Sequence, residues 1–116
     1  MISLQLNLYI LVYDYDIKSF DILSTRPDTL EVPNTKILDG TNSIRSHLDT
    51  MLDTHTINSE TIQYRLLNNI IIENVYHSIY FCTISKNDNI QNLYQLPIKE
   101  YAIHSPNIQQ IMRIIT

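Results

Sequence analysis

The chain has 116 residues and carries 8 Lys and Arg against 12 Asp and Glu, which gives a net charge of -4. This length has room for one core, so residues 1–116 are predicted to form a single domain, and the acidic balance argues against direct nucleic-acid binding. The single glycine, Gly40, excludes glycine-rich phosphate loops, which need several glycines.

The first part of the chain is predicted to be extended. Residues 3–13 (SLQLNLYILVY) alternate and then become wholly apolar, which indicates a strand that is half buried and later buried on both faces. A second strand is expected over residues 20–25. A short extended piece is expected over residues 30–32, because Pro33 disfavours helical geometry in the residue before it.

A helix is predicted next. Thr41 is expected to be its N-cap, followed by helical spacing over residues 42–55. Asp49 and Asp53 stand four residues apart on the other side of this helix, where a solvated face is the ordinary interpretation. The apolar stripe consists of Ile44, Leu48, Met51, Leu52 and His55.

The second half is predicted to be rich in strands and to end in a helix. Residues 61–67, 69–72 and 75–85 contain many β-branched and aromatic side chains, which indicates two or three long antiparallel strands. A short strand is then broken by Pro97, and Ser105 with Pro106 opens a final helix. The stripe of that helix is Ile108, Ile111, Met112 and Ile115. This order predicts an α+β domain: a mixed sheet with a helix on each side or end.

The sequence also bears on location and origin. The amino terminus lacks a basic region and a small-residue cleavage site, and no apolar run approaches the roughly 20 residues that span a bilayer. A soluble protein is therefore expected, without a signal peptide or membrane partner, inside a cell or within a virion. Twenty isoleucines and eleven asparagines are typical of AT-rich genomes, which include those of many small viruses and phages.

The segment from residue 33 to 57, PNTKILDGTNSIRSHLDTMLDTHTI, resembles the signature of the Nudix hydrolase domain family. In that family a Pro-Gly-Gly turn precedes an acidic-Gly-Glu step, a helix with Arg-Glu-(apolar)-x-Glu-Glu, and a closing x-Gly-(apolar). The match is in frame and needs no gap. It places Pro33 on the proline, Asn34 and Thr35 on the paired glycines, Gly40 and Thr41 on Gly-Glu, Asp49 and Thr50 on Arg-Glu, Asp53 and Thr54 on Glu-Glu, and Thr56 on the late glycine. The resemblance implies a Nudix-like mixed β-sheet sandwiched by helices.

The resemblance also implies a lost catalytic site. Nudix enzymes use the helix glutamates to collect Mg²⁺ or Mn²⁺, and such hard ions need several oxygen ligands, preferably charged. Of the mapped acidic positions only Asp53 keeps a carboxylate, so it is the one remaining metal candidate, and no catalytic residue or cofactor is predicted. Thr35, being β-branched, is expected to reshape the glycine turn. The positions interpreted as vestigial are Pro33, Gly40, Thr41, Asp49, Thr50, Asp53 and Thr54.

Other candidate sites are not supported by the sequence. The four histidines, His47, His55, His77 and His104, lack zinc-site spacing, and the first two are expected to be packing or partly exposed residues. Cys82 lies in the apolar run IYFCTI, where a buried and unreactive thiol is expected.

Three functions remain open at this stage. The first is a catalytically inactive domain that serves as a structural or interaction subunit of a larger assembly, with protein partners and a virus or phage particle as the expected assembly. Tyrosine is enriched at interfaces, which supports this, although sheet packing explains the eight tyrosines equally well. The tyrosines expected near strand ends and loops are Tyr13, Tyr15, Tyr76, Tyr94 and Tyr101.

The second open function is a nucleotide-derivative binding module without catalysis, which would need convergent polar groups in an apolar pocket. The cations expected near such a pocket are Arg26, Lys36, Arg45 and Arg65. The third is a residual Mg²⁺- or Mn²⁺-dependent hydrolase of nucleoside diphosphates linked to another moiety, with Asp49 and Asp53 among the ligands. The sequence therefore leaves open whether the protein is an enzyme.

Overall fold

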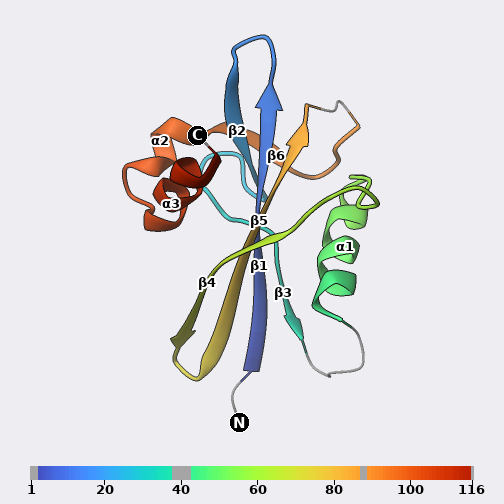
Figure 1. Cartoon of the computed structure of the whole chain (residues 1–116), viewed down its shortest axis with the longest axis vertical. Helices are drawn as coiled ribbons and strands as arrows, with labels where there is room; N and C mark the ends of the chain where they lie inside the picture. Colours follow the sequence, from blue (N-terminus) through green and yellow to red (C-terminus); the bar gives the residue numbers. More distant parts are fainter. Residues whose placement is uncertain (1–2, 38–42, 87–88, 116) are drawn as a thin grey trace.

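The computed structural model describes residues 3–37, 43–86 and 89–115. In these ranges the chain forms a mixed sheet with helices on both faces (Figure 1). The elements in order are β1 (Ser3–Asp14), β2 (Ser19–Ser24), β3 (Asn34–Ile37), α1 (Ile44–Thr54), β4 (Arg65–Ile72), β5 (Val75–Ser85), β6 (Tyr94–Pro97), α2 (Ile98–Ala102) and α3 (Pro106–Ile115). No helix among the described residues is long and apolar enough to cross a membrane.

Strand β1 organises the sheet. It pairs in parallel with β5 without interruption from Ser3–Val75 to Tyr13–Ser85. Its opposite edge is shared by two antiparallel partners, because β3 pairs with Leu4–Asn7 and β2 pairs with Leu11–Asp14. The strand order is β4-β5-β1-β2-β6, with β3 beside β1, so the sheet is mixed as predicted.

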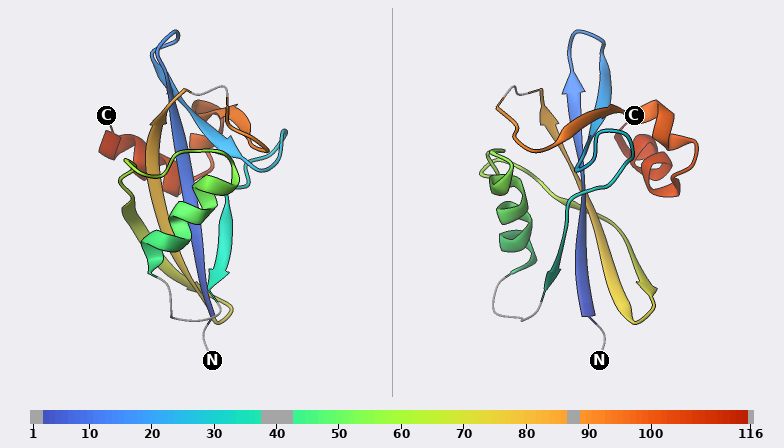
Figure 2. Two further views of the ribbon diagram at one scale, coloured as in Figure 1. Left: turned by 90° about the vertical axis from the view of Figure 1, so that its right-hand side faces the viewer. Right: turned by 180° about the vertical axis from the view of Figure 1, so that it is seen from behind.

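The helices cover opposite faces of this sheet (Figure 2). Helix α1 lies on one face, and α2 and α3 lie on the other. Alternate residues of β1 contribute to the two cores, because side chains alternate across a strand. The core under α1 contains Leu6, Leu8, Ile10, Val12, Leu48, Met51 and Leu52. The core under α3 contains Leu11, Ile22, Phe81, Ile98, Ile108 and Ile111.

Helix α1 starts later than predicted. Its N-cap is Ser43, whose Oγ accepts a hydrogen bond from the backbone N–H of Ser46 at 3.1 Å. The prediction of Thr41 as N-cap was therefore wrong, because a second hydroxyl residue lies closer to the first apolar position. Thr41 itself and Gly40 lie outside the described residues.

The strand near Pro33 lies after the proline, and residues 30–32, predicted to be an extended piece, are not part of it. Residues 30–33 form no strand, whereas Asn34–Ile37 form strand β3, which pairs with β1 on the edge opposite β5. The segment before Pro33 is folded around the buried hydroxyl of Ser24. That hydroxyl donates to the carbonyl of Thr29 at 2.8 Å and accepts from the backbone N–H groups of Arg26 and Glu31. These local bonds replace strand pairing.

The second half of the chain also differs from prediction in detail. The strand predicted over residues 61–67 begins only at Arg65, and it continues through residues 69–72 as one strand, β4, with a bulge between Leu66 and Asn68. Glu73 and Asn74 connect β4 to β5 with φ values of 50° and 66°, which is typical of a two-residue type I′ hairpin turn. Helix α2 was not predicted, because five residues are too few to show helical periodicity.

The remaining predicted elements are confirmed. β1, β2 and β5 lie where alternation indicated, and β6 ends at Pro97. Helix α3 begins at Pro106, and the Oγ of Ser105 accepts from the N–H of Ile108 at 3.3 Å. Its whole predicted stripe packs into the core under α3. Of the tyrosines, Tyr101 lies within α2 rather than in a loop.

Candidate functional site

A cleft of about 430 Å³ separates helix α1 from the chain segment 25–35. We call it the α1 cleft. One wall is that segment together with the start of β3, and the other is one side of α1. The residues important for its chemistry are Glu31, Asn34, Thr35, His47, Thr50, Thr54 and His55. Several positions of the proposed Nudix signature thus lie together in one place.

The side of α1 that faces the cleft carries hydroxyls. Thr50 and Thr54 stand four residues apart, so they lie one above the other on the helix. The Oγ1 of Thr50 donates to the carbonyl of Ser46 at 3.0 Å, and the Oγ1 of Thr54 donates to the carbonyl of Thr50 at 2.8 Å. Their protons are therefore directed to the helix backbone rather than into the cleft.

One carboxylate occurs among the described residues that line the α1 cleft. It belongs to Glu31, whose Oε2 lies 2.8 Å from the Nε of Arg26 and whose Oε1 accepts from the Oγ1 of Thr25 at 2.9 Å. Both carboxylate oxygens are thus engaged by neighbours in the same loop. The pair is exposed to solvent, so it contributes little to stability, roughly 0–1 kcal/mol.

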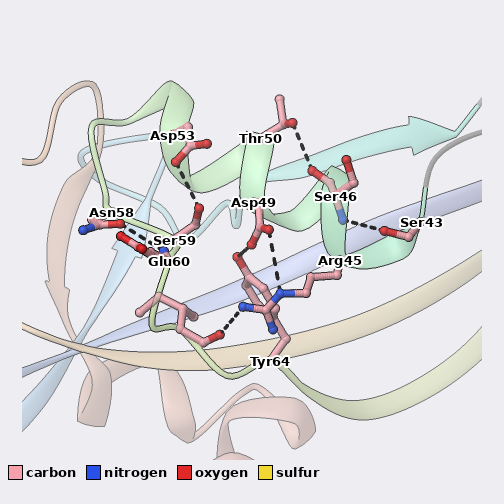
Figure 3. A network of polar contacts seen from close by, with 11 residues as sticks. Ser43, Arg45, Ser46, Asp49, Thr50, Asp53, Asn58, Ser59, Glu60 and Tyr64 are labelled. Carbon is pink, nitrogen blue, oxygen red and sulfur yellow. Dashed lines mark hydrogen bonds and ion pairs between the residues drawn. The ribbon is translucent and has the colours of Figure 1, made fainter.

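The two helix aspartates belong to the opposite side of α1 (Figure 3). The hydroxyl of Tyr64 donates to Oδ1 of Asp49 at 2.6 Å, and the Oγ of Ser59 donates to Oδ1 of Asp53 at 3.2 Å. Neither aspartate lines the α1 cleft, whereas Thr50 points away from this network. Asp49 and Asp53 therefore hold the segment 58–64 against the helix.

Arg45 completes this network. Its Nη2 donates to the carbonyl of Ile62 at 2.8 Å, its Nε lies 3.8 Å from Asp49 Oδ2, and its guanidinium lies 5.2 Å from the centre of the Tyr64 ring. Burial, aided by the hydrogen bond to Asp49, raises the pKa of Tyr64 above its ordinary value. The Tyr64 hydroxyl is thus held as a neutral donor, which suits a structural role.

The residues of the cleft do not fit a bound Mg²⁺ or Mn²⁺ ion. Within the described ranges no group of three or more His, Cys, Asp or Glu side chains is placed to hold a metal. The candidate ligand Asp53 does not line the cleft and accepts a hydrogen bond from Ser59, whereas Glu31 lines the cleft. A hard divalent cation needs several oxygen ligands around one point, and these side chains do not supply them.

The end of helix α1 keeps a backbone shape that glycine favours. His55 is the C-cap, and Thr56 follows with φ of 61° in the left-handed region. The N–H of Thr56 donates to the carbonyl of Asp53 and the N–H of Ile57 donates to that of Leu52, both at 3.0 Å. This is a Schellman motif with a β-branched residue where glycine is usual. Thr56 is the position matched to the late glycine of the Nudix signature.

The two residues matched to the paired glycines of the Nudix signature form a strand in place of a turn. Asn34 and Thr35 belong to strand β3, where they pair with Asn7 and Leu6. Neither is among the residues with positive φ, so this stretch is extended rather than a left-handed turn. The absence of glycine here is therefore compatible with the backbone.

Two of the four histidines, His47 and His55, line the α1 cleft, and His77 and His104 lie elsewhere. The Nδ1 of His55 lies 2.9 Å from the carbonyl oxygen of Gln91, and the N–H of Gln91 returns a bond to the carbonyl of His55, also at 2.9 Å. His77 contacts Asn7 at 3.3 Å on the neighbouring strand. His47 lines the α1 cleft, and its Nε2 is buried without a hydrogen-bond partner. His47 was expected only to pack, so this buried nitrogen was not foreseen.

Cys82 behaves as predicted from its apolar neighbours. It is buried in the core under α1, and burial raises the pKa of its thiol to about 12. The thiolate that acts as a nucleophile is therefore scarce at neutral pH.

A second cavity, also of about 430 Å³, was not predicted from the sequence. We call it the tyrosine cavity, because Tyr9 and Tyr101 line it together with Leu30, Glu100 and His104. The hydroxyl of Tyr9 accepts from Asn107 Nδ2 at 3.2 Å. The lining residues come from β1, the loop 29–32, α2 and the turn after it, so no local sequence pattern indicates the cavity.

Solved structures with the same architecture include Nudix proteins and domains. The Caenorhabditis elegans Ap4A hydrolase aligns with a TM-score of 0.69 and 10% identity over 100% of both chains. The NUDIX domain of Shewanella oneidensis NrtR, solved with ADP ribose, gives 0.66 and 11% over 100% of this chain and 90% of that one. A MutT/nudix family protein from Listeria innocua gives 0.64 and 10% over 97% and 93%.

The chain therefore has the Nudix-like α+β fold that the sequence resemblance implied. These identities are low enough that the likeness is one of fold alone. No protein-family model matches the sequence, and no curated protein sequence matches it.

Replacing Thr56 by glycine should stabilise the protein. Removal of the side chain relieves the left-handed strain, and after the entropy cost of glycine we expect a gain of about 0.5–1 kcal/mol, seen as a higher Tm. Thr83→Gly is the matched control, because Thr83 lies in strand β5, where glycine should lower the Tm. A lower Tm in both variants would contradict the strained geometry at Thr56.

Placing glutamates on the cleft side of α1 should create a metal site. In the double variant Thr50→Glu, Thr54→Glu, two new carboxylates would join Glu31, and we expect Mn²⁺ binding at about millimolar or tighter. Loss of the free-ion electron paramagnetic resonance signal measures it. The control Asp49→Glu, Asp53→Glu changes the far side of α1 and should bind no better than the natural chain. Equal binding by both double variants would contradict the assignment of the two sides.

Proposed function

We propose that this protein is a catalytically inactive Nudix-like domain that serves as a structural or interaction subunit of a larger assembly. The observation that carries the proposal is the chemistry of α1: threonines face the cleft, and both helix aspartates are used to hold the segment 58–64. Loss of a single catalytic base typically slows an enzyme by about 10²–10⁴-fold. Loss of most ligands together leaves no support for metal-dependent hydrolysis.

The outer edge of β4 supports the interaction role. β4 is the last strand on its side of the sheet, so one row of its backbone groups has no strand partner among the described residues. Several of its apolar side chains are also open to solvent, with Leu66, Ile71 and Ile72 exposed by 52%, 60% and 50%. Long, apolar edge strands are sites where a strand from another chain adds to a sheet. We infer that a protein partner pairs with this edge.

Composition supports the kind of assembly. The many isoleucines and asparagines are common in chains from small AT-rich genomes, so a virus or phage particle is the assembly we propose. The exposed Tyr15 and Tyr94 add contact residues of the type enriched at interfaces.

A second candidate function is the binding of a nucleotide derivative without hydrolysis. The tyrosine cavity favours it, because two aromatic rings, a carboxylate and an imidazole converge there. Aromatic walls with a few polar groups are typical of small-molecule sites. The Arg and Lys residues expected near a pocket are absent from the described lining of this one.

One experiment separates these functions from hydrolysis. The protein is incubated with a panel of nucleoside diphosphates linked to another group, with Mg²⁺ or Mn²⁺, and both products and Tm are measured. We expect no product, because one carboxylate lines the described part of the cleft and no described group of three His, Cys, Asp or Glu side chains is placed to hold a metal. Product that disappears in Asp53→Ala would overturn the proposal of inactivity. A ligand-dependent rise in Tm that Tyr101→Ala abolishes would put the binding function first. At a ligand concentration a hundredfold above Kd, the free energy of unfolding should rise by about 2.7 kcal/mol.

The exposed edge of β4 should control association. Without its partner the protein is expected to self-associate through this edge at high concentration, and Ile71→Lys should return it toward 13.6 kDa in light scattering. Ile103→Lys is the matched control, because Ile103 is 71% exposed at the end of α2 and distant in the fold from β4. The same mass for all three proteins at every concentration would contradict a docking role for β4.

A further inference from the structure

A third cavity, of about 230 Å³, lies where the β1–β2 hairpin meets α2 and α3. We call it the lysine cavity. Its apolar lining comes from Tyr13, Phe20, Ile98, Met112 and Ile115, and its polar lining from Lys18, Ser19 and Lys99. It is separate from the α1 cleft and the tyrosine cavity, with which it shares no lining residue.

The walls of the lysine cavity are formed by packed side chains. The rings of Tyr13 and Phe20 meet edge to face with their centres 5.1 Å apart. Ile98 is 3% exposed in the core under α3, and Met112 and Ile115 pack against the same core. Because these side chains are held by the fold, the cavity exists before any ligand enters, which lowers the cost of binding.

The charge at the lysine cavity is opposite to that of the whole protein. The chain has a net charge of -4, yet two of its few lysines line this one cavity and no described lining residue is acidic. Among the described residues, no carboxylate forms an ion pair with Lys18 or Lys99. The nearby Asp14 is instead engaged by Lys86 at 3.3 Å and by the N–H of Asp16 at 2.9 Å.

The backbone fixes where the side chain of Lys18 begins. Lys18 has φ of 50°, a left-handed geometry that costs a non-glycine residue energy and is stable only where the surroundings determine it. The hairpin turn therefore sets the direction in which the Lys18 side chain leaves the backbone, and that side chain lines the cavity beside Tyr13 and Phe20. Lys99 approaches from α2, on the other side of the cavity.

We propose that the lysine cavity binds a small organic anion, a carboxylate joined to one ring or a short apolar chain. The apolar part would occupy the space between Phe20 and Met112, and the carboxylate would lie between the two ammonium groups. The volume is below the about 300–1,000 Å³ of usual small-molecule sites, so one ring or a short chain fills it. The same chemistry can come from a free acid or from the C-terminal residue of a protein chain.

The test is a titration of the full chain with 4-phenylbutyrate, followed by the backbone amide shifts of Phe20, Lys99 and Met112. A ligand of this size should bind with a dissociation constant on the order of millimolar. The alcohol 4-phenylbutanol has the same ring and chain without the charge, and it should bind at least about fivefold more weakly than the acid. Equal binding of acid and alcohol, or saturable shifts confined to another region, would overturn the proposal.

Substitution of the lysines gives an independent measure. Lys18→Gly removes one charge while suiting the left-handed backbone, so its fold is retained, and Lys99→Gln removes the other from an exposed position. Each should weaken 4-phenylbutyrate binding by about two- to fivefold. Lys36→Gln is the matched control on β3 and should leave binding unchanged. Equal weakening by all three would show a general charge effect and refute the site.

A comparison of two peptides identifies the source of the anion. A tetrapeptide ending in phenylalanine is compared in its free-acid and C-terminally amidated forms. Tighter binding of the free-acid peptide than of 4-phenylbutyrate supports a protein C-terminus as the ligand, and weaker binding supports a free acid. If the amidated peptide binds as well as its free acid, the carboxylate is not recognised and the proposal fails.

Discussion

The burial of β1 on both faces is the constraint on which the structure depends. Leu8 and Ile10 belong to the core under α1, whereas Leu11 belongs to the core under α3, so this strand needs apolar side chains on both sides. The edge of β1 that faces away from β5 is divided between β3 and β2. The segment joining β2 to β3 must therefore pass from one half of β1 to the other. That passage places residues 29–35 between the α1 cleft and the tyrosine cavity.

Contacts within the chain account for the stability of helix α1 in this Nudix-like fold. A cluster of carboxylates in one cleft is destabilised by mutual repulsion unless a cation is bound. Threonines at positions 50 and 54 remove that repulsion, and their hydroxyls are satisfied within the helix. The carboxylates of Asp49 and Asp53 lie on the other side, where each accepts a hydrogen bond from the segment 58–64. Packing and capping, including the left-handed Thr56, thus stabilise the helix.

Most of the fold could be predicted because long strands and the two longer helices have a clear hydrophobic period. The errors fall where particular hydrogen bonds, rather than the hydrophobic period, decide the outcome: Ser24 folds the loop before Pro33, and the edge of β1 selects Asn34–Ile37 as a strand. The site was predicted less well. Helical geometry places Asp53 and Thr54 on different sides of α1, but only the packed structure shows which side faces the cleft. Cavities assembled from distant segments leave no local pattern at all.

The edges of the sheet differ in how they resist pairing with other chains. β6 is short and ends in Pro97, and β3 spans four residues and carries the exposed Lys36, which are common ways of blocking an edge. β4 is twice as long, and its protection is the exposed Arg65 and a single bulge near its start, whereas residues 70 to 72 are all isoleucine. A run of this kind promotes aggregation when it stays open to solvent. The open isoleucine run of β4 therefore supports the proposed protein partner at this edge.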